Sequence, residues 1–394
     1  MLRLISPCLK TGALRRFSGK ATFNGFQTMM GQIKGLKLAL VHDWLNQRGG
    51  AEDVLETLVA MCPESPVYTS LYAPDLMPAF YRAWDIRTLW IDRLPGIHTH
   101  HQRYLPLYPV AWGGLNLSDY DVILTNKSGF CHGLHHDARA THICYCLAPT
   151  RYVWGLESYI AREGLSNLAA SVLRPLIAAI KQWDYAAAQR VDHFIAISTA
   201  IQTRIKTYYQ RDSVIIYPPV ETTRFVPAAR TDDYFLVVSR LIPYKRIDLA
   251  VQAATRLGVR LLVGGKGRDL DRLKAMAGPT VEFLGFVPDD DLPALMAHCK
   301  AFLFPGLEDF GITPVQAQAA GRPVIAYGGG GALDTVIPGV TGELFTELTV
   351  ESLMDVMRDF DAARYESAAI RTHAEQFDTR HFRTQLTAFI EQHT

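Results

Sequence analysis

Residues 239–246 (SRLIPYKR) bring together the groups that can hold a diphosphate without a metal ion. They follow a strand-like run and lead into a helix-like segment that begins near Ile247. The guanidinium of Arg240 and the ammonium of Lys245 would lie at a strand end, beside the positive end of a helix. These residues alone leave a solvated basic cluster open as the alternative.

Residues 305–321 (PGLEDFGITPVQAQAAG) form the second segment with chemical potential. Thr313 as N-cap, Pro314 at the first helical position and Gly321 just past the end predict a helix of about two turns. Glu308 precedes this helix, so its carboxylate would lie near the backbone amides at the helix start. Such a carboxylate can bind sugar hydroxyls while the amides meet phosphate or sugar oxygens.

Two smaller features accompany these segments. Gln316 stands three residues after Thr313, which fits either a ligand contact or the glutamine half of a capping box. Gly49 and Gly50 form a turn that opens a helix-like segment directly after a strand-like run. Without side chains the backbone can approach a ligand closely there, and the helix end favours an anion.

Three further patterns favour structural interpretations. Residues 264–267 (GGKG) lack the G-x-G-x-x-G spacing of a dinucleotide loop, so nicotinamide chemistry is not expected. Residues 289–291 (DDD) contain a D-x-D pair that could hold a divalent metal, but their position before Leu292 favours a helix start. The histidines 132, 135 and 136 have no carboxylate or thiolate at metal-ligand spacing, and we expect no metal site.

The elements that position these residues follow the pattern of βα units, in which short apolar runs alternate with amphipathic stretches. Residues 217–220 (YPPV) interrupt the pattern and predict a domain boundary, because consecutive prolines suit neither helix nor strand. The predicted strands before it are 36–41, 120–124, 141–147, 191–197 and 213–217, and those after it are 234–239, 260–264, 281–284, 301–304 and 323–327.

One predicted helix is well defined. Apolar residues recur at helical spacing over residues 247–257, and Gly258 stands where a left-handed C-terminal residue is needed. We therefore expect two doubly wound α/β domains. Functional loops of such domains lie at the carboxyl ends of the strands, so a ligand is expected in the interdomain cleft.

The composition excludes several other classes of protein. The chain has 394 residues with 40 Lys and Arg against 39 Asp and Glu, a formal net charge of +1 that does not suggest a nucleic-acid partner. No run approaches the roughly 20 apolar residues that span a bilayer. Six cysteines without a C-x-x-C pair predict reduced thiols and a cytoplasmic location.

The first 34 residues differ in composition from the rest. They carry several basic residues, and the first acidic residue of the chain is Asp43. This composition predicts a flexible basic leader over residues 1–34, with a transit peptide or an arm that touches the membrane surface as alternatives.

Together, three motifs resemble glycosyltransferase family 4, and most strongly its mannosyltransferase-like branch in bacterial surface polysaccharide synthesis. The motifs are residues 308–315 (EDFGITPV), residues 239–246 and residues 42–52 (HDWLNQRGGAE). The resemblance extends through residues 319–331 (AAGRPVIAYGGGG) and covers the chain from about Leu36 to its end.

The resemblance implies a GT-B fold and metal-independent, anomer-retaining transfer from a nucleotide sugar. It implies an acceptor-side domain over 35–220, a nucleotide-sugar-binding domain over 221–375 and a last helix, 376–394, that crosses back to the first domain. The residues that it implies are catalytic Arg240, Lys245 and Glu308, donor-binding Gly49, Gly50, Ser239, Phe286, Val287, Phe310, Gly311, Ile312 and Gln316, and acceptor-side Arg151, Tyr152 and His132.

Two positions depart from the family pattern. Relatives commonly carry a glutamate where Gln316 stands, which accepts from the ribose hydroxyls; glutamine loses the charge and would bind the donor more weakly. Relatives also often carry a histidine where Leu147 stands, and leucine cannot hydrogen-bond. Arg151, Tyr152, His132 or His142 are candidates to compensate.

The expected function is therefore transfer of a sugar, with GDP-mannose as the favoured donor and no cofactor, to a glycan or a lipid-linked acceptor. The expected location is the cytoplasm, with contact at the inner face of the membrane as an extension. The alternatives are a catalytically weak relative that acts as a binding or scaffold subunit, and a GT-B epimerase or hydrolase of sugar nucleotides. The second alternative needs additional acid and base residues, which the sequence does not identify.

Overall fold

The computed structural model of the protein describes residues 35–155 and 167–394, without the side chains of Tyr152 and residues 167–173. The predicted leader, residues 1–34, lies outside this part. Residues Lys37–Thr394 form one compact unit that contains two parallel β-sheets. No helix among the described residues is long and apolar enough to cross a membrane.

The first sheet has seven strands in the order β3-β2-β1-β4-β5-β6-β7, and every described pairing is parallel. Its central strands are buried on both faces and are therefore almost continuously apolar, as in β1 (LALVH). The bounds are β1 Leu38–His42, β2 Val67–Thr69, β3 Ile86–Thr88, β4 Val122–Lys127, β5 Thr141–Cys146, β6 His193–Ala196 and β7 Ser213–Ile215.

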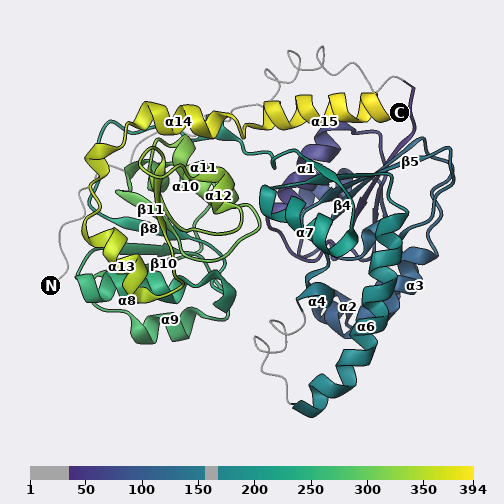
Figure 1. Cartoon of the computed structure of the whole chain (residues 1–394), viewed down its shortest axis with the longest axis horizontal. Coiled ribbons are helices and arrows are strands. Elements are labelled where there is room, and N and C mark those ends of the chain that lie inside the picture. Colours follow the sequence, from purple (N-terminus) through teal and green to yellow (C-terminus); the bar gives the residue numbers. More distant parts are fainter. Residues whose placement is uncertain (1–34, 156–166) are drawn as a thin grey trace. The chain divides into compact units, whose positions relative to one another are not determined.

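The second sheet has six parallel strands in the order β10-β9-β8-β11-β12-β13. Figure 1 shows helices on both of its faces, with α8, α9 and α13 on one and α10, α11 and α12 on the other. The bounds are β8 Phe235–Val238, β9 Leu261–Gly264, β10 Val281–Gly285, β11 Ala301–Phe304, β12 Val324–Tyr327 and β13 Gly342–Phe345.

The described α-helices and 3₁₀-helices connect these strands. The α-helices are α1 Gly50–Met61, α2 Ile97–His100, α3 Tyr108–Gly113, α4 Arg151–Trp154, α6 Asn167–Gln189, α7 Thr199–Tyr209, α8 Ile247–Leu257, α9 Leu270–Met276, α10 Leu292–His298, α11 Ile312–Ala319, α12 Ala332–Thr335, α13 Val350–Arg358, α14 Ser367–Glu375 and α15 Thr379–His393. The 3₁₀-helices are η1 Ala79–Ala83, η2 Trp90–Arg93, η3 His101–Leu107, η4 Cys131–Gly133, η5 Thr222–Arg224, η6 Pro243–Lys245 and η7 Ala362–Arg364.

Both sheets follow the doubly wound plan that the sequence predicts, and all ten predicted strands are present. The predicted helix 247–257 is confirmed as α8. It ends at Gly258, whose φ of 67° is the left-handed conformation expected at a helix C-terminus. Its buried stripe of Ile247, Ala250, Val251 and Ala254 packs into the core of the second sheet.

The two sheet orders place the functional loops. In each order the chain first adds strands on one side and then returns to add strands on the other, so a switch point lies between β1 and β4 and another between β8 and β11. Ligands of doubly wound sheets bind outside the carboxyl ends of the strands at such switch points. Gly49 and Gly50 follow β1, Arg240 and Lys245 follow β8, and Glu308 follows β11.

The C-terminal helix α15 contacts strands of the first sheet. The Phe382 ring packs edge-on against the Tyr145 ring of β5, with 5.5 Å between the centroids. Thr141 at the start of β5 donates a hydrogen bond to the carbonyl of His393 at 3.2 Å. The residues before the helix are fixed to the domain boundary, because Asp378 accepts a hydrogen bond from Thr222 and its neighbour Thr379 donates to the carbonyl of Val220.

Candidate functional site

An ion pair stands at the switch point of the second sheet. Lys245 ends η6 in the loop after β8, and Glu308 lies in the loop after the neighbouring strand β11. Lys245 Nζ lies 2.5 Å from Glu308 Oε1, and the two side chains are only 19% and 11% exposed. The sequence therefore placed both groups correctly at strand ends, and the fold brings them into contact.

The backbone around Lys245 is unusual. Arg246, which follows it, has a φ of 51°, a left-handed conformation that is uncommon for a residue with a side chain. Gly306 in the loop after β11 lies directly against Lys245, because an added Cβ would be 2.8 Å from the Lys245 carbonyl oxygen. The two loops are thus pressed together, which fixes Lys245 next to Glu308.

Glu308 retains hydrogen-bonding capacity in this arrangement. Its Oε1 is buried and accepts no hydrogen bond from the described residues, although Lys245 Nζ is close. The ion pair is therefore a contact of charges in which the N–H direction is poorly aligned with the oxygen. No described residue therefore satisfies this buried oxygen by a hydrogen bond.

The helix α11 begins earlier than the sequence predicts. Its N-cap is Gly311 with a φ of 109°, and the first helical residue is Ile312, so the prediction of Thr313 as N-cap is wrong. Glycine allows this left-handed turn, and a side chain at this position would also collide with the Phe304 ring at 2.9 Å. Because Thr313 is not the cap, Gln316 is not half of a capping box.

The start of α11 carries free backbone donors. Within the part of the chain that the structure describes, no carbonyl or side chain accepts from the amides of Phe310, Gly311 and Ile312. Gln316 is half-buried, beside these amides in the first turns of α11. Both features leave donors and acceptors for a ligand on this loop.

The glycine turn after β1 reaches the same region. Gly50 is the first residue of α1, and an added Cβ there would lie 3.0 Å from Cδ1 of Ile312. Its neighbour Gln47 accepts a hydrogen bond from Arg240 at 3.3 Å. The structure therefore brings four of the predicted positions, Gly49, Gly50, Arg240 and Ile312, to one junction of loops.

Arg48 of this turn contacts the first residue of the acidic run 289–291. Its guanidinium donates to Asp289 at 3.3 Å and also to Glu56 of α1. The helix that the sequence predicted after the acidic run begins at Leu292, with Asp291 as its N-cap residue. Among the residues that the structure describes, no group of three or more His, Cys, Asp or Glu side chains is arranged to hold a metal ion.

Two buried carboxylates that the sequence did not single out support the loops of the first sheet. Asp43 directly after β1 accepts hydrogen bonds from the four consecutive amides of residues 128–131, at 2.6–2.8 Å. Asp184 of α6 accepts from Thr150 at 2.6 Å, Trp154 at 2.7 Å and Tyr209 at 2.8 Å. These bonds fix the turn after β4 and the short helix α4.

The same network corrects the expectation for His132. This side chain is completely buried, and its Nε2 lies 3.3 Å from the carbonyl oxygen of Asp184. Burial also lowers the pKa of His132 well below its ordinary value, so the ring is neutral at pH 7. His132 therefore has no surface with which to contact an acceptor, and it belongs to the support of α4.

Lys127 at the end of β4 completes this buried network. Its ammonium is fully buried and donates to the carbonyl of Ala148 at 3.1 Å and to the hydroxyl of Thr150 at 3.2 Å. Burial by itself lowers the pKa of Lys127, but the nearby Tyr209, Cys146 and Asp184 groups outweigh it and raise the pKa well above its ordinary value. The lysine is therefore charged, and with Asp184 it holds the segment 148–154.

Arg151, the first residue of α4, contacts the loop after β11, which carries Glu308 and Asp309. Its guanidinium donates to Asp309, which also accepts from Arg204 of α7 at 2.5 Å. Burial alone would raise the pKa of Asp309, but the charges of Arg151 and Arg204 outweigh it and hold the pKa below its usual value. Tyr152 lies in the same helix, and its side chain is outside the described residues.

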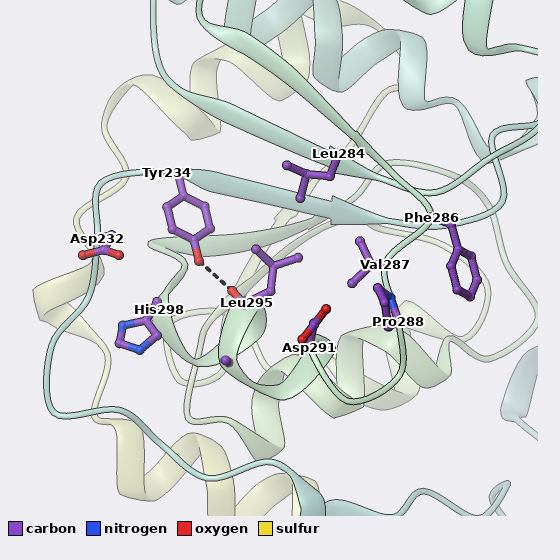
Figure 2. Close-up of a pocket in the computed structure, with 10 residues that line it drawn as sticks. Asp232, Tyr234, Leu284, Phe286, Val287, Pro288, Asp291, Leu295 and His298 are labelled. Carbon is purple, nitrogen blue, oxygen red and sulfur yellow. Dashed lines mark hydrogen bonds between the residues drawn. The ribbon is translucent and has the colours of Figure 1, made fainter. Parts of the chain in front are cut away.

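Phe286 and Val287 lie apart from the Lys245–Glu308 pair. They line a hollow of about 420 Å³ between strand β10 and helix α10, shown in Figure 2, in which Tyr234 donates a hydrogen bond to the Leu295 carbonyl at 2.7 Å. None of Arg240, Lys245 and Glu308 lines this hollow. Phe286, which lines this hollow, is 65% exposed.

The glycines of the segment 264–267 (GGKG) are needed for close packing of the backbone. An added Cβ at Gly265 would lie 1.8 Å from the Ser239 carbonyl oxygen, and one at Gly267 would lie 2.1 Å from that of Leu241. The segment therefore packs directly against the backbone after β8. These glycines keep the loop that carries Arg240 in place.

Comparison with solved structures defines the class of fold. The chain is similar to Anabaena Alr3699/HepE in complex with UDP, with 19% identity, a TM-score of 0.67 and coverage of 91% of this chain and 100% of that one. It is also similar to sucrose-phosphate synthase from Thermosynechococcus elongatus, with 17% identity, a TM-score of 0.67 and coverage of 90% and 98%. With its two doubly wound sheets, the protein has the GT-B fold that the family resemblance implied.

Two family models then match consecutive parts of the chain. The model described as Glycosyltransferase Family 4 matches residues 48–224, and the model described as Glycosyl transferases group 1 matches residues 220–376. The chain belongs to this family of group 1 glycosyltransferases.

Curated relatives match over shorter stretches. A GDP-mannose-dependent alpha-(1-6)-phosphatidylinositol monomannoside mannosyltransferase of Mycolicibacterium smegmatis is 31% identical over 183 residues, which are 39% of this chain and 48% of that protein. A 2-deoxystreptamine glucosyltransferase of Streptomyces kanamyceticus is 39% identical over 110 residues, which are 25% of this chain and 28% of that protein. The chain thus spans about half the length of the mannosyltransferase and less of the glucosyltransferase.

Proposed function

We propose that the protein is a retaining, metal-independent glycosyltransferase that moves a sugar from a nucleotide sugar to a glycan or a lipid-linked acceptor in cell-surface polysaccharide synthesis. The observation that carries this proposal is the Lys245–Glu308 pair at the switch point of the second sheet. It joins a cation suited to a diphosphate with a carboxylate suited to a sugar hydroxyl.

The chemistry of transfer makes specific demands on these residues. The bond from the anomeric carbon to the diphosphate oxygen breaks, the acceptor oxygen bonds to that carbon, and the acceptor's proton passes to the departing diphosphate. The departing nucleoside diphosphate gains negative charge at the transition state, and cations fixed in a dry site stabilise it. Arg240 and Lys245 supply this positive charge, and the free amides at the start of α11 add partial charge.

The remaining site residues have supporting roles in the proposal. The Glu308 carboxylate accepts from a hydroxyl of the donor sugar, and Ser239, Phe310, Gly311 and Ile312 border the donor. Gly49 and Gly50 let the ligand approach the backbone at the end of β1. Phe286 and Val287 border the nucleotide base, and Arg151 with Tyr152 faces the acceptor, within a cleft between the 35–220 and 221–375 domains.

GDP-mannose is the favoured donor. The name of the similar Mycolicibacterium smegmatis protein includes GDP-mannose and a phosphatidylinositol mannoside, which supports mannose as the sugar and a lipid-linked acceptor. The similar Anabaena structure holds UDP, which makes UDP-sugars the first donors to compare. A lipid acceptor would bring the protein to the cytoplasmic face of a membrane, with residues 1–34 as the contact.

A catalytically weak relative that acts as a binding or scaffold subunit is the second candidate. Leu147 cannot hydrogen-bond to a donor sugar, and Gln316 is neutral where relatives carry a glutamate. Against this candidate stands the intact set of Arg240, Lys245 and Glu308, since a chain without selection for transfer would be expected to lose the diphosphate contacts as well.

A panel of nucleotide sugars tests the proposal. The purified protein is incubated in EDTA with GDP-mannose, UDP-glucose and related donors, while the melting temperature and the release of free nucleoside diphosphate are recorded. The proposal expects one donor to stabilise the fold and to be cleaved slowly, because a ligand that binds only the folded state raises its stability. Stabilisation without cleavage, or no response to any donor, would contradict the proposal and favour the binding or scaffold subunit.

A further inference from the structure

Two consecutive carboxylates in the loop after β11 have partners from different sheets. Glu308 contacts Lys245, which belongs to the second sheet's own switch point. The side chain of the next residue, Asp309, is 10% exposed, and its ion-pair partners among the described residues are Arg151 and Arg204, from elements of the first sheet. Asp309 therefore ties the donor-side loop to the acceptor-side half of the protein.

Both arginines come from firmly held elements. Arg151 follows Thr150, whose hydroxyl donates to the buried Asp184 carboxylate at 2.6 Å, and α4 ends at Trp154, which donates to the same carboxylate. Arg204 lies in α7, whose start is capped by Ser198, which accepts from the Ile201 amide at 3.2 Å. Both guanidinium groups are thus carried by fixed helices, α4 and α7, that connect strands of the first sheet. Their ion pairs with Asp309 therefore set the position of its carboxylate.

Asp309 and Glu308 are neighbours in the loop after β11, so a shift of one can move the other. Phe310 packs against the Tyr217 and Phe377 rings at centroid distances of 5.8 and 5.7 Å, and these two rings also contact each other. Gly311 then turns with a φ of 109° into α11. With Phe310 and Gly311 fixed on one side, a shift of Asp309 would move the adjacent Glu308 side chain, while the Glu308 carbonyl stays bonded to the Gly331 amide at 2.9 Å.

We propose that Asp309 is a positioning residue that sets the Glu308 carboxylate against the donor sugar only while Arg151 and Arg204 hold it. The inference rests on the proposed function and deepens it. The diphosphate is held by Arg240 and Lys245, which Asp309 does not contact. Loss of Asp309 should therefore impair the chemical step far more than nucleotide binding.

A second carboxylate supplies a matched control. Asp334 at α12 accepts hydrogen bonds from Thr199 at 2.9 Å and Tyr217 at 3.2 Å, so it also joins the second sheet's side to residues before the domain boundary. Its partners are uncharged, and it is not adjacent to Glu308. A contact between the two halves that served stability alone would make the Asp309 and Asp334 variants behave alike.

The experiment compares Asp309→Asn, Asp309→Glu, Asp334→Asn, Arg204→Gln and Arg204→Lys. For each variant, kcat for donor cleavage, Kd for GDP and UDP, and the melting temperature are measured. Asp309→Asn should lower kcat by about one to two orders of magnitude, because displacing a catalytic group by about 1 Å has an effect of this size. The Kd for the nucleotides should stay within about threefold of the wild-type value. Arg204→Lys should retain more kcat than Arg204→Gln, and Asp309→Glu should recover part of the loss.

Double variants test the coupling. Asp309→Asn with Arg204→Gln should be no slower than Asp309→Asn alone, because residues that act together are not additive. Asp334→Asn should leave kcat within about threefold of the wild type. Equal kcat losses for the Asp309 and Asp334 variants, or a Kd that weakens in proportion to kcat, would overturn the inference.

Hydrogen exchange separates this inference from the proposed function. If the wild type cleaves no nucleotide sugar, the proposed function fails. The positioning role is then judged in the ligand-free protein, where Asp309→Asn should speed amide exchange over residues 306–312 and Asp334→Asn should not. Unchanged exchange over these residues in both variants would overturn the positioning role.

Discussion

Replacement of Lys245 by methionine tests the site most informatively, because it separates the stability of the ion pair from its chemical use. Methionine keeps the length of the side chain and removes its charge. At the 2.5 Å separation of Lys245 Nζ and Glu308 Oε1, an effective dielectric constant of about 20 gives a gross attraction of about 7 kcal/mol. The cost of removing both groups from water offsets most of this attraction.

The net effect on stability follows from burial. Both side chains are mostly buried, at 19% and 11% exposure, so the loss lies between the 0–1 kcal/mol of exposed pairs and the 3–5 kcal/mol of broken buried pairs. We expect Lys245→Met to lower the free energy of unfolding by about 2 kcal/mol, which corresponds to about 4–8 °C in Tm for a domain of this size. Adding Glu308→Gln removes the stranded charge and should restore most of that stability.

The catalytic effect should not be restored with the stability. Loss of one cation that meets the leaving diphosphate should lower kcat/KM by about 10²–10³-fold, and the double variant should be no faster than the single one. Scanning fluorimetry and the rate of nucleoside diphosphate release measure the two effects on the same samples. The reasoning would be refuted by Lys245→Met with activity within threefold of the wild type, or by a double variant no more stable than the single one.

Three further predictions follow from the same loops. Gln316→Glu should tighten GDP or UDP binding by about threefold to tenfold if this residue meets the ribose, since a charged acceptor forms a stronger hydrogen bond; an unchanged Kd in calorimetry would remove that contact. Gly311→Ala should lower the free energy of unfolding by about 1–3 kcal/mol, because its φ of 109° and the Phe304 ring oppose a side chain; a denaturant curve that matches the wild type would contradict this. The Asp309 pKa is lowered in the fold, so its stabilisation is complete above the unfolded pKa of about 4 and is lost as the pH falls through the folded value. Stability curves between pH 6 and pH 2 should therefore be steeper for the wild type than for Asp309→Asn, and parallel curves would contradict the pairing.

Much of the architecture could be predicted because buried parallel strands are runs of apolar residues. The strands missed, β2, β3 and β13, have three or four residues each and mix polar with apolar side chains, as in β3 (IRT). Strand β4 was placed at residues 120–124 and lies at Val122–Lys127, because its last residues are polar yet buried. Asn126 and Lys127 break the apolar pattern because their side chains donate hydrogen bonds to the carbonyls of Ala51 and Ala148. These contacts join distant parts of the chain and cannot be recognised from local sequence.

The sequence predicts the chemical groups within each loop of the site, but not the contacts between loops. Arg240, Lys245 and Glu308 were found from residue type beside a strand end. The pairing of Asp309 with Arg151 spans 158 positions, and no local spacing reports a contact over that distance. An acidic residue directly after Glu308 was the available clue to it.

The start of α11 was predicted wrongly for a local reason. Thr313 followed by Pro314 is a typical helix start, but Gly311 can adopt a left-handed conformation that begins the helix two residues earlier. That earlier start places the amides of Phe310, Gly311 and Ile312 beside Glu308. Glycine at this position therefore decides where α11 begins and which backbone amides are left without a helical acceptor.

The central claim, that Arg240 and Lys245 hold a diphosphate, is tested most directly by calorimetry on the wild-type protein in EDTA. GDP is compared with GMP, and UDP with UMP. The account predicts that for at least one base the diphosphate binds at least about tenfold more tightly than the monophosphate, since charge-assisted contacts to the second phosphate contribute about 1.5–3 kcal/mol each. Equal affinities of diphosphate and monophosphate for both bases would contradict it.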